Sequence, residues 1–298
     1  MEQTRVTLAN GIELDTVDVG PRDAPALIFL HGFPENHRTW RHQIAHFSEN
    51  YRCIAPDQRG YRGSSRPEAV EDYTPDKLIG DVFALADALD VQDFTIVGHD
   101  WGGAIAWGTA YWGQASGRVK RCIIANAPHP VTFGKLLHTS RTQRAASQYM
   151  RAFRDTSWDE RTRREGLLPL LTEVTQWQAH ERMEPPEREQ LLDDWSDGDA
   201  AIAMLNWYRA TPLDVPPLDA PYDLPADYAP PPLPQLSIPT LVVWGMDDLA
   251  LPPENMDGLE AIIDDLTVER IEGAGHFVPW EAPDAVIGAM ERFLERPA

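Results

Sequence analysis

The sequence predicts an α/β protein whose central sheet is mostly parallel and flanked by helices. Short apolar runs alternate with helical patterns through the first 130 residues, and the same alternation returns near the C-terminus. Strands that alternate with helices favour parallel pairing, because each helix carries the chain back across the sheet. A long segment between these two parts has only helical patterns. We therefore expect one α/β core that is interrupted by a helical insertion.

Each element of the first part follows from a short pattern. Ala26–Leu30 is a continuous apolar run, typical of a strand that is buried on both faces. Residues 74–89 are predicted to form a helix with Thr74 as its N-cap and Pro75 at its first position. The other expected elements are strands at 6–8, 14–19, 52–56, 94–97 and 119–125, and helices at 40–47 and 104–112.

The alternation stops after about residue 130. Residues 131–208 read as helices, and residues 211–235 are crowded with proline and acidic residues, which indicates an irregular return connection. This connection either lies on the surface or mediates a homodimer. Strands are predicted again at 239–244 and 266–271, followed by an amphipathic helix at 283–294. The predicted division is therefore core 1–130, helical cap with a proline-rich return segment 131–235, and core 236–298.

The composition excludes several classes of partner. The formal net charge of −21 argues against a nucleic-acid partner and against docking on an anionic membrane. The two cysteines, Cys53 and Cys122, lie in strand-like runs, so buried thiols are expected rather than a disulfide. The N-terminal residues have no apolar signal region, and no apolar run is long enough to span a membrane. These features favour a cytoplasmic protein.

No metal or cofactor site is expected. His42 and His46 lie four residues apart on one predicted helix face, but the pair lacks the glutamate of a zinc-binding helix motif and has no evident third ligand. The sequence also lacks a glycine-rich phosphate loop of standard spacing.

The most informative stretch is Gly98-His-Asp-Trp-Gly102, between the predicted strand at 94–97 and the helix that follows. This strand–turn–helix context is that of a nucleophile elbow, with Asp100 where serine usually stands. Glycines two residues before and after the nucleophile allow a sharp turn, and the positive end of the helix dipole favours an ionised carboxylate. The alternative is that Asp100 merely caps the helix.

Two further loops supply partners for Asp100. Asp247 and Asp248 follow the predicted strand at 239–244, and His276 follows the strand at 266–271 among small residues. The order nucleophile, acid, histidine is that of α/β hydrolases, and Asp248 is favoured over Asp247 because it lies three residues past Gly245. The backbone N–H groups of Phe33 and Trp101 are predicted to form an oxyanion hole, although the loop around Phe33 also fits a simple Gly-Pro turn.

Over nearly its whole length, the chain resembles the α/β-hydrolase superfamily. Within it, the sequence is similar to the epoxide hydrolase and haloalkane dehalogenase branch, in which aspartate is the nucleophile. The stretches that match epoxide hydrolase patterns are His31-Gly-Phe-Pro-Glu35, Asp57-Gln-Arg-Gly-Tyr61 and His99-Asp-Trp-Gly102. The resemblance implies an α/β-hydrolase fold with an inserted helical cap and a covalent ester on Asp100.

The resemblance also implies two tyrosines in the cap that hold an epoxide oxygen. Tyr208 lies in Asn206-Trp-Tyr-Arg209, which matches one family motif. Tyr149 lies four residues before Phe153, as in the second motif, although Arg154 replaces the glutamine expected next. The alternative for both tyrosines is ordinary aromatic packing between cap and core.

The expected reaction is hydrolysis of a small apolar epoxide to a vicinal diol. Asp100 forms the ester, and water activated by His276 and Asp248 hydrolyses it. The residues expected to contact the substrate are Phe33, Trp101, Trp207 and Phe277.

Two other functions fit parts of the sequence. A hydrolytic dehalogenase would share the nucleophile. However, haloalkane dehalogenases usually have asparagine where Phe33 stands, and haloacetate dehalogenases usually have arginines at the places of Trp101 and Ala104. A ligand receptor could use the same scaffold, but it has no need of Asp100, Asp248 and His276 together.

Overall fold

The computed structural model describes residues 2–175 and 178–296 and has an eight-stranded sheet at its centre. The sheet order is β1-β2-β4-β3-β5-β6-β7-β8. β2 pairs antiparallel with β1 and β4, and all later neighbours are parallel. The strands are β1 (Thr4–Thr7), β2 (Glu13–Val19), β3 (Ala26–Leu30), β4 (Arg52–Pro56), β5 (Phe94–His99), β6 (Val119–Ala125), β7 (Thr240–Gly245) and β8 (Leu266–Ile271). The predicted mostly parallel α/β architecture is confirmed.

Helices cover both faces of the sheet. Alternate residues of β3 point to opposite faces, so Leu27 packs in the cluster with α1 and α12 while Ile28 packs in the cluster with α2 and α3. This explains why β3 is apolar throughout rather than alternating. The core helices are α1 (Arg41–Phe47), α2 (Pro75–Ala88), α3 (Trp101–Ser116), α11 (Val278–Glu281) and α12 (Pro283–Leu294).

Two helix boundaries and one predicted capping hydrogen bond differ from the predictions. A 3₁₀ turn, His37–Trp40, precedes α1, so Trp40 lies before the α-helix rather than inside it. Helix α2 begins at Pro75 as expected, but the Thr74 side chain makes no capping hydrogen bond. Helix α3 begins directly after Asp100 and is longer than predicted. Its residues Gly102 and Gly103 lie close to neighbouring backbone and to Ala127.

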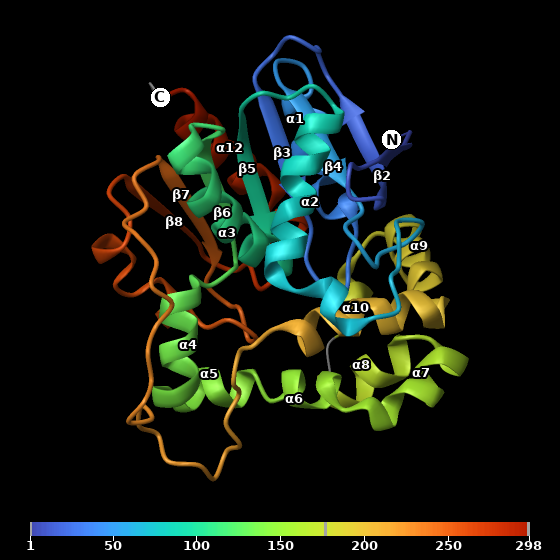
Figure 1. The fold of residues 1–298 in the computed structure, drawn as a ribbon, viewed down its shortest axis with the longest axis vertical. Helices are drawn as coiled ribbons and strands as arrows, with labels where there is room; N and C mark the ends of the chain where they lie inside the picture. The colour runs from blue at the N-terminus through green and yellow to red at the C-terminus, as the bar shows by residue number, and fades with distance from the viewer. Residues whose placement is uncertain (1, 176–177, 297–298) are drawn as a thin grey trace.

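In the part of the chain that the structure describes, seven α-helices lie between β6 and β7 and form a layer beyond one end of the sheet (Figure 1). They are α4 (Pro130–Thr139), α5 (Arg141–Ala146), α6 (Tyr149–Arg154), α7 (Asp159–Glu165), α8 (Leu168–Val174), α9 (Pro185–Ser196) and α10 (Gly198–Ala210). An irregular segment, 211–239, then returns along the side of the core, where Gln114 in α3 bonds the backbone of Gln235 and Ser237. We call α4–α10 the cap helices and 211–239 the return segment.

The parallel strands place the predicted site residues at one edge of the sheet. The carboxyl ends of parallel strands meet at the same edge, and ligands commonly bind there in α/β proteins. Phe33 follows β3, Asp100 follows β5, Asp248 follows β7 and His276 follows β8. The cap helices lie over this edge.

Other predictions concern cysteines and membrane spans. Cys53 and Cys122 are both free and buried in strands, as expected. Within the described ranges, the search for helices long and apolar enough to cross a bilayer finds none.

Candidate active site

Asp100 lies in a sharp turn between β5 and α3. Its backbone has φ 51° and ψ −122°, a conformation that residues with a side chain rarely adopt. A Cβ at Gly98 would lie 2.4 Å from the Gly102 carbonyl oxygen, and one at Gly102 would lie 2.3 Å from the Leu30 carbonyl oxygen. The glycines therefore permit a turn that places the Asp100 carboxylate beyond the end of β5, at the edge of the sheet.

The Asp100 carboxylate is held by backbone donors. The Phe33 N–H donates to Asp100 Oδ1 at 2.7 Å, and the Trp101 N–H also donates to this carboxylate. Burial raises the pKa of Asp100, but hydrogen bonding and charge from His276, together with the Trp101 N–H, outweigh burial and hold the pKa below its usual value. The carboxylate is therefore ionised at neutral pH.

His276 lies between two carboxylates. Its Nδ1–H donates to Asp248 Oδ2 at 2.8 Å, and its Nε2 is 3.5 Å from Asp100 Oδ2. Asp247, the other candidate acid, is exposed, while its neighbour Asp248 is buried. The structure thus brings together the predicted Asp100, Asp248 and His276.

The charge of His276 follows from these neighbours. Burial lowers the pKa of His276, but the Asp248 carboxylate, and then Asp100, raise it well above its usual value. An imidazolium placed between two carboxylates is the favoured state of this arrangement. Loss of the negative charge on Asp100 would remove one of the two causes that raise the pKa of His276.

Asn126 is a site residue that sequence reasoning missed. It follows β6 with a positive φ of 38°, and its Nδ2 donates to Asp248 Oδ2 at 2.7 Å. Its Oδ1 accepts from the Gly245 N–H at 2.8 Å, which fixes the amide orientation. Asp248 Oδ1 accepts from the backbone of Ala250 and Leu251. The side chain of Asp248 is therefore fixed on both oxygens. Its place at a strand end was the available signal for Asn126, since asparagine tolerates positive φ.

Two more buried groups surround His276. The His99 Nε2–H donates to the His276 carbonyl oxygen at 2.8 Å, and burial lowers the pKa of His99 to about 4. Glu35 accepts from Thr39 Oγ1 and Trp280 Nε1, and burial raises its pKa to about 7. His99 is therefore a neutral support of the His276 backbone.

Tyr149 and Tyr208 face the Asp100 turn from the cap. Tyr208 lies in α10, with its ring centroid 5.1 Å from Trp101 and 6.0 Å from that of Tyr149 in α6. Burial is the main cause that raises the pKa of both phenols. The charge of Asp100 raises the pKa of Tyr149 further, and the neighbouring Tyr149 raises that of Tyr208. Both side chains are therefore protonated at neutral pH and can act as hydrogen-bond donors.

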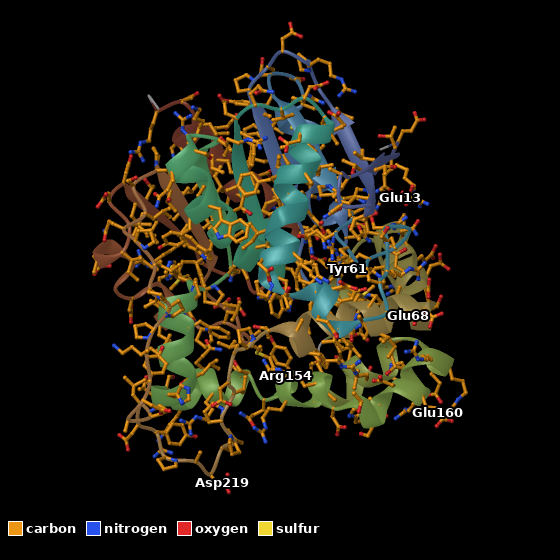
Figure 2. The ribbon with its side chains drawn as sticks, viewed as in Figure 1. Glu13, Tyr61, Glu68, Arg154, Glu160 and Asp219 are labelled. Carbon is orange, nitrogen blue, oxygen red and sulfur yellow. The ribbon has the colours of Figure 1, made fainter. Side chains whose placement is uncertain are left out.

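Arginines tie together the two helices that carry these tyrosines. Arg154, labelled in Figure 2, donates from Nε to the Tyr208 carbonyl oxygen at 2.9 Å. Arg209 donates in return to the Phe153 carbonyl oxygen at 3.3 Å and pairs with Asp159. The arginine at position 154, where the family pattern has glutamine, thus has a structural role between α6 and α10.

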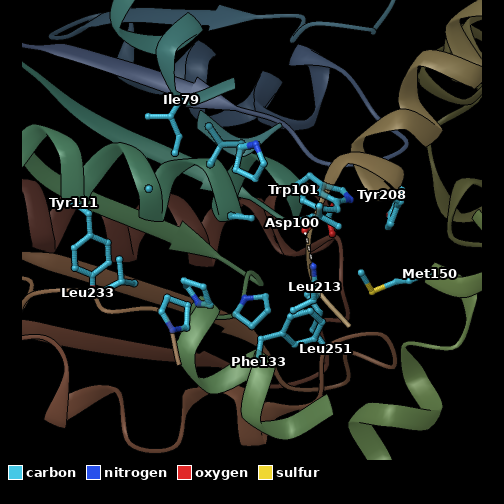
Figure 3. Close-up of a pocket in the computed structure, with 18 of the residues that line it drawn as sticks. Ile79, Asp100, Trp101, Tyr111, Phe133, Met150, Tyr208, Leu213, Leu233 and Leu251 are labelled. Atoms are coloured by element: carbon cyan, nitrogen blue, oxygen red, sulfur yellow. Dashed lines mark hydrogen bonds between the residues drawn. The ribbon is translucent and has the colours of Figure 1, made fainter. Parts of the chain in front are cut away.

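An apolar cavity of about 270 Å³ opens beside Asp100 (Figure 3). Its volume is near the lower end for small-molecule sites. Trp101, Tyr149 and Tyr208 are among its lining residues, and Met150 of α6 was not predicted. Met150 could not be predicted as a lining residue because nothing in the sequence indicates which side of α6 faces the core.

Three residues predicted to contact substrate lie outside the described lining of this cavity. Phe33 is buried with its ring centroid 5.1 Å from Tyr208, and Trp207 donates to the Arg59 carbonyl oxygen at 2.9 Å. Phe277 stacks on Trp280. In this structure the three side chains pack around the site. Their contact with substrate remains a prediction.

Within residues 2–175 and 178–296, no group of three or more His, Cys, Asp or Glu side chains is placed to hold a metal ion. His46, part of the histidine pair considered above, lies 2.7 Å from Glu291 instead.

Comparison with known proteins gives the family. Residues 25–283 match the family described as alpha/beta hydrolase fold. The chain is 31% identical to Epoxide hydrolase 1 of Caenorhabditis elegans, over 96% of this chain and 68% of that protein. It is also 30% identical to Epoxide hydrolase A of Mycobacterium tuberculosis, over 97% and 96% of the two chains.

Solved structures agree with this assignment. An epoxide hydrolase from metagenomes of hot environments is 64% identical, with a TM-score of 0.97 over 100% of this chain and 99% of that one. A Bacillus megaterium epoxide hydrolase in complex with its product, (R)-3-[1]naphthyloxy-propane-1,2-diol, is 29% identical, with a TM-score of 0.83 over 98% and 100% of the chains. The chain therefore belongs to the α/β-hydrolase fold family, in its epoxide hydrolase branch.

Proposed function

We propose that the chain hydrolyses epoxides to vicinal diols through a covalent ester on Asp100. The observation that carries this proposal is the placement of an ionised carboxylate, Asp100, opposite two protonated phenols beside an apolar cavity. A carboxylate attacks without a base to activate it. Phenols donate to the ring oxygen that leaves. The relatives described above are named epoxide hydrolases, which supports the same reaction.

In the first step, the Asp100 carboxylate attacks one ring carbon. Oδ1 is engaged by the Phe33 N–H, so Oδ2 is the oxygen that forms the new C–O bond. The ring C–O bond breaks, and the alkoxide takes a proton from Tyr149 or Tyr208. Proton donation of this kind contributes on the order of 10²-fold or more. The phenolate regains a proton by way of solvent when the His276 imidazolium releases its own, so the protons balance before ester hydrolysis.

In the second step, water hydrolyses the ester. His276 accepts a proton from the water, which attacks the ester carbonyl carbon and releases the diol and the Asp100 carboxylate. The Phe33 and Trp101 N–H groups stabilise the tetrahedral oxyanion, by roughly 3 kcal/mol each. Ester formation removes the Asp100 charge, so the pKa of His276 falls and the imidazole becomes available as a base. Asp248, fixed by Asn126, orients the ring.

The two phenols favour an epoxide over a haloalkane. A leaving epoxide oxygen stays attached to the substrate and needs a proton, whereas a leaving halide does not. Phe33 supplies only its backbone N–H to Asp100, and its side chain has no donor for a halide.

Trapping the ester tests the proposal. His276→Gln, treated with styrene oxide, should accumulate protein heavier by the mass of the epoxide, with the modification on Asp100. Asp100→Asn under the same conditions should remain unmodified, apart from slow deamidation. Single turnover of the wild type in ¹⁸O-labelled water should place the label in Asp100. No adduct on the His276 variant, or chloride release from a haloalkane without epoxide turnover, would contradict the proposal.

A further inference from the structure

The cavity beside Asp100 continues along one face of α3. Trp101, Ala104, Ile105, Gly108 and Tyr111 all line it, and their spacing places them on the same face of the helix. At 1.5 Å per residue, Trp101 to Tyr111 spans about 15 Å. Figure 3 shows Asp100 and Trp101 toward one end of the cavity, and Tyr111 with Leu233 of the return segment at the other. The cavity is therefore a channel that leads away from the nucleophile.

The walls of this channel are apolar. Opposite α3 lie side chains from α2, α4 and the return segment, among them Ile79, Phe133, Leu213 and Leu233. Asp100 is the one charged residue in the described lining, and it lies at the reactive end. A charged group buried midway along the channel would lack a counter-charge there and would be costly to desolvate. The channel thus suits an uncharged substituent.

The side of Asp100 toward the cap is filled by rings. Phe33, Phe153 and Tyr208 have centroids 5.0 to 5.2 Å apart, and all three are buried. A second large substituent on the epoxide would meet this cluster. The room for substrate lies on the α3 side, so the geometry favours an epoxide with one large substituent.

Gly108 and Ile79 are in contact at the wall of the channel. It lies inside α3, where glycine is less favourable than alanine for helix stability. A Cβ at this position would lie 2.3 Å from Ile79 Cδ1 and 3.1 Å from Ile79 Cγ1. The missing side chain therefore lets Ile79 pack directly on the α3 backbone, and a side chain at this position would push Ile79 into the channel.

Resting on the function proposed above, we propose that the substrate is a terminal epoxide with one elongated, uncharged apolar substituent that lies along α3 past Gly108. Gly108, opposite Ile79, determines whether such a substituent fits. An epoxide with a very small substituent occupies only the end of the channel near Asp100 and does not reach Gly108.

The test compares the terminal epoxides of propane and decane. The wild type should have the higher kcat/KM for the decane epoxide. Gly108→Val should lower that kcat/KM by roughly tenfold or more, a size typical of steric discrimination in an apolar pocket, and leave the propane epoxide within about twofold. Ile79→Ala added to Gly108→Val should restore much of the loss, because it removes the atoms that the new side chain meets. Gly80→Val is the matched control, since a Cβ at Gly80 in α2 has no atom within 4 Å.

Each outcome decides one question. Equal losses for both epoxides in Gly108→Val, or no loss for either, would overturn the channel proposal. So would equal kcat/KM of the wild type for the decane epoxide and for the same epoxide ending in a carboxylate. Wild-type turnover of neither epoxide would instead contradict the proposed function itself.

Discussion

The two sides of the site differ in how they hold their functional groups. On the core side, Asp100, Asp248 and His276 are charged groups on loops after parallel strands, and hydrogen bonds fix them. On the cap side, Tyr149 and Tyr208 are neutral phenols on two helices, and aromatic rings surround them.

The difference matches two chemical tasks. In the proposed mechanism, the nucleophile must be ionised and its partners held in place, which a sheet edge rich in backbone donors provides. A proton donor to a leaving oxygen must stay neutral until it acts, which burial among rings provides. The charged groups of the site therefore lie on the core side, and the groups on the cap side of the cavity are neutral.

The largest effect is expected from neutralising the core side. Asp100→Asn should lower epoxide turnover by on the order of 10⁴-fold or more, because removal of a covalent nucleophile leaves only background catalysis. Turnover of styrene oxide measures this loss. Asp247→Asn, an exposed carboxylate in a neighbouring loop, should leave turnover unchanged. A variant at Asp100 that retained a tenth of the activity would show that the carboxylate is not the nucleophile.

Removing the cap hydroxyls should affect ester formation alone. Tyr149→Phe and Tyr208→Phe should each slow the first step by on the order of 10²-fold, and the double variant by more, since each phenol acts as a proton donor. Rapid-quench measurement of the protein adduct separates this step from ester hydrolysis. Tyr51→Phe, on a tyrosine that packs against Phe47, is the control. If ester hydrolysis slowed while ester formation was unchanged, the proposed role of the phenols in ester formation would be wrong.

A smaller effect is expected at Asn126. Asn126→Gly tolerates the positive φ but removes the amide that donates to Asp248, a hydrogen bond to a charged group worth about 1.5–3 kcal/mol. Ester hydrolysis should slow about tenfold while ester formation is unchanged, so the adduct should accumulate in the steady state. Equal slowing of both steps would point to a general disturbance of the fold.

The smallest effect is on stability against pH. The pKa of His276 is higher in the folded protein than in the unfolded chain, so protonation of His276 stabilises the fold. This stabilisation is complete below the pKa of the unfolded chain, about 6.5, and is lost as the pH rises through the pKa of the folded protein. The pKa of Asp100 is lower in the folded protein, so its ionised form also stabilises the fold. This stabilisation is present above the pKa of the unfolded chain, about 3.9, and is lost as the pH falls through the pKa of the folded protein. The free energy of unfolding, compared between wild type and His276→Gln, should differ most between about pH 4 and 6.5. A difference that grows toward alkaline pH would contradict the ionised pair.

Much of the core could be predicted from the sequence because its signals are local. Strands at 52–56, 119–125 and 266–271 and the helix at 283–294 have the predicted bounds. The turn at Asp100 could be predicted because its two glycines flank Asp100 between a strand and a helix, although the contact that requires Gly102 is with the distant Leu30. Asp248 could be separated from Asp247 by its spacing from Gly245, and their burial agrees with that choice.

The cap could not be predicted in this way. Its helices are short, and their orientation depends on packing that no local pattern specifies. Tyr149 and Tyr208 were found through a family resemblance alone, and the packing of Phe33, Trp207 and Phe277 around the cavity depends on that three-dimensional arrangement. Asn126 was missed because its partner, Asp248, is far away in the sequence.

The insertion between β6 and β7, which comprises the cap helices and the return segment, affects how the molecule folds. β6 ends at Ala125 and its parallel neighbour β7 begins at Thr240, so about 110 residues separate these two adjacent strands of the sheet. Closing so long a loop costs conformational entropy before the pairing stabilises it, and such non-local contacts slow folding. β3, β4, β5 and β6 are close together in the sequence and can pair early. The edge that unites Asp100 with Asp248 and His276 is therefore completed late, when β7 and β8 join the sheet.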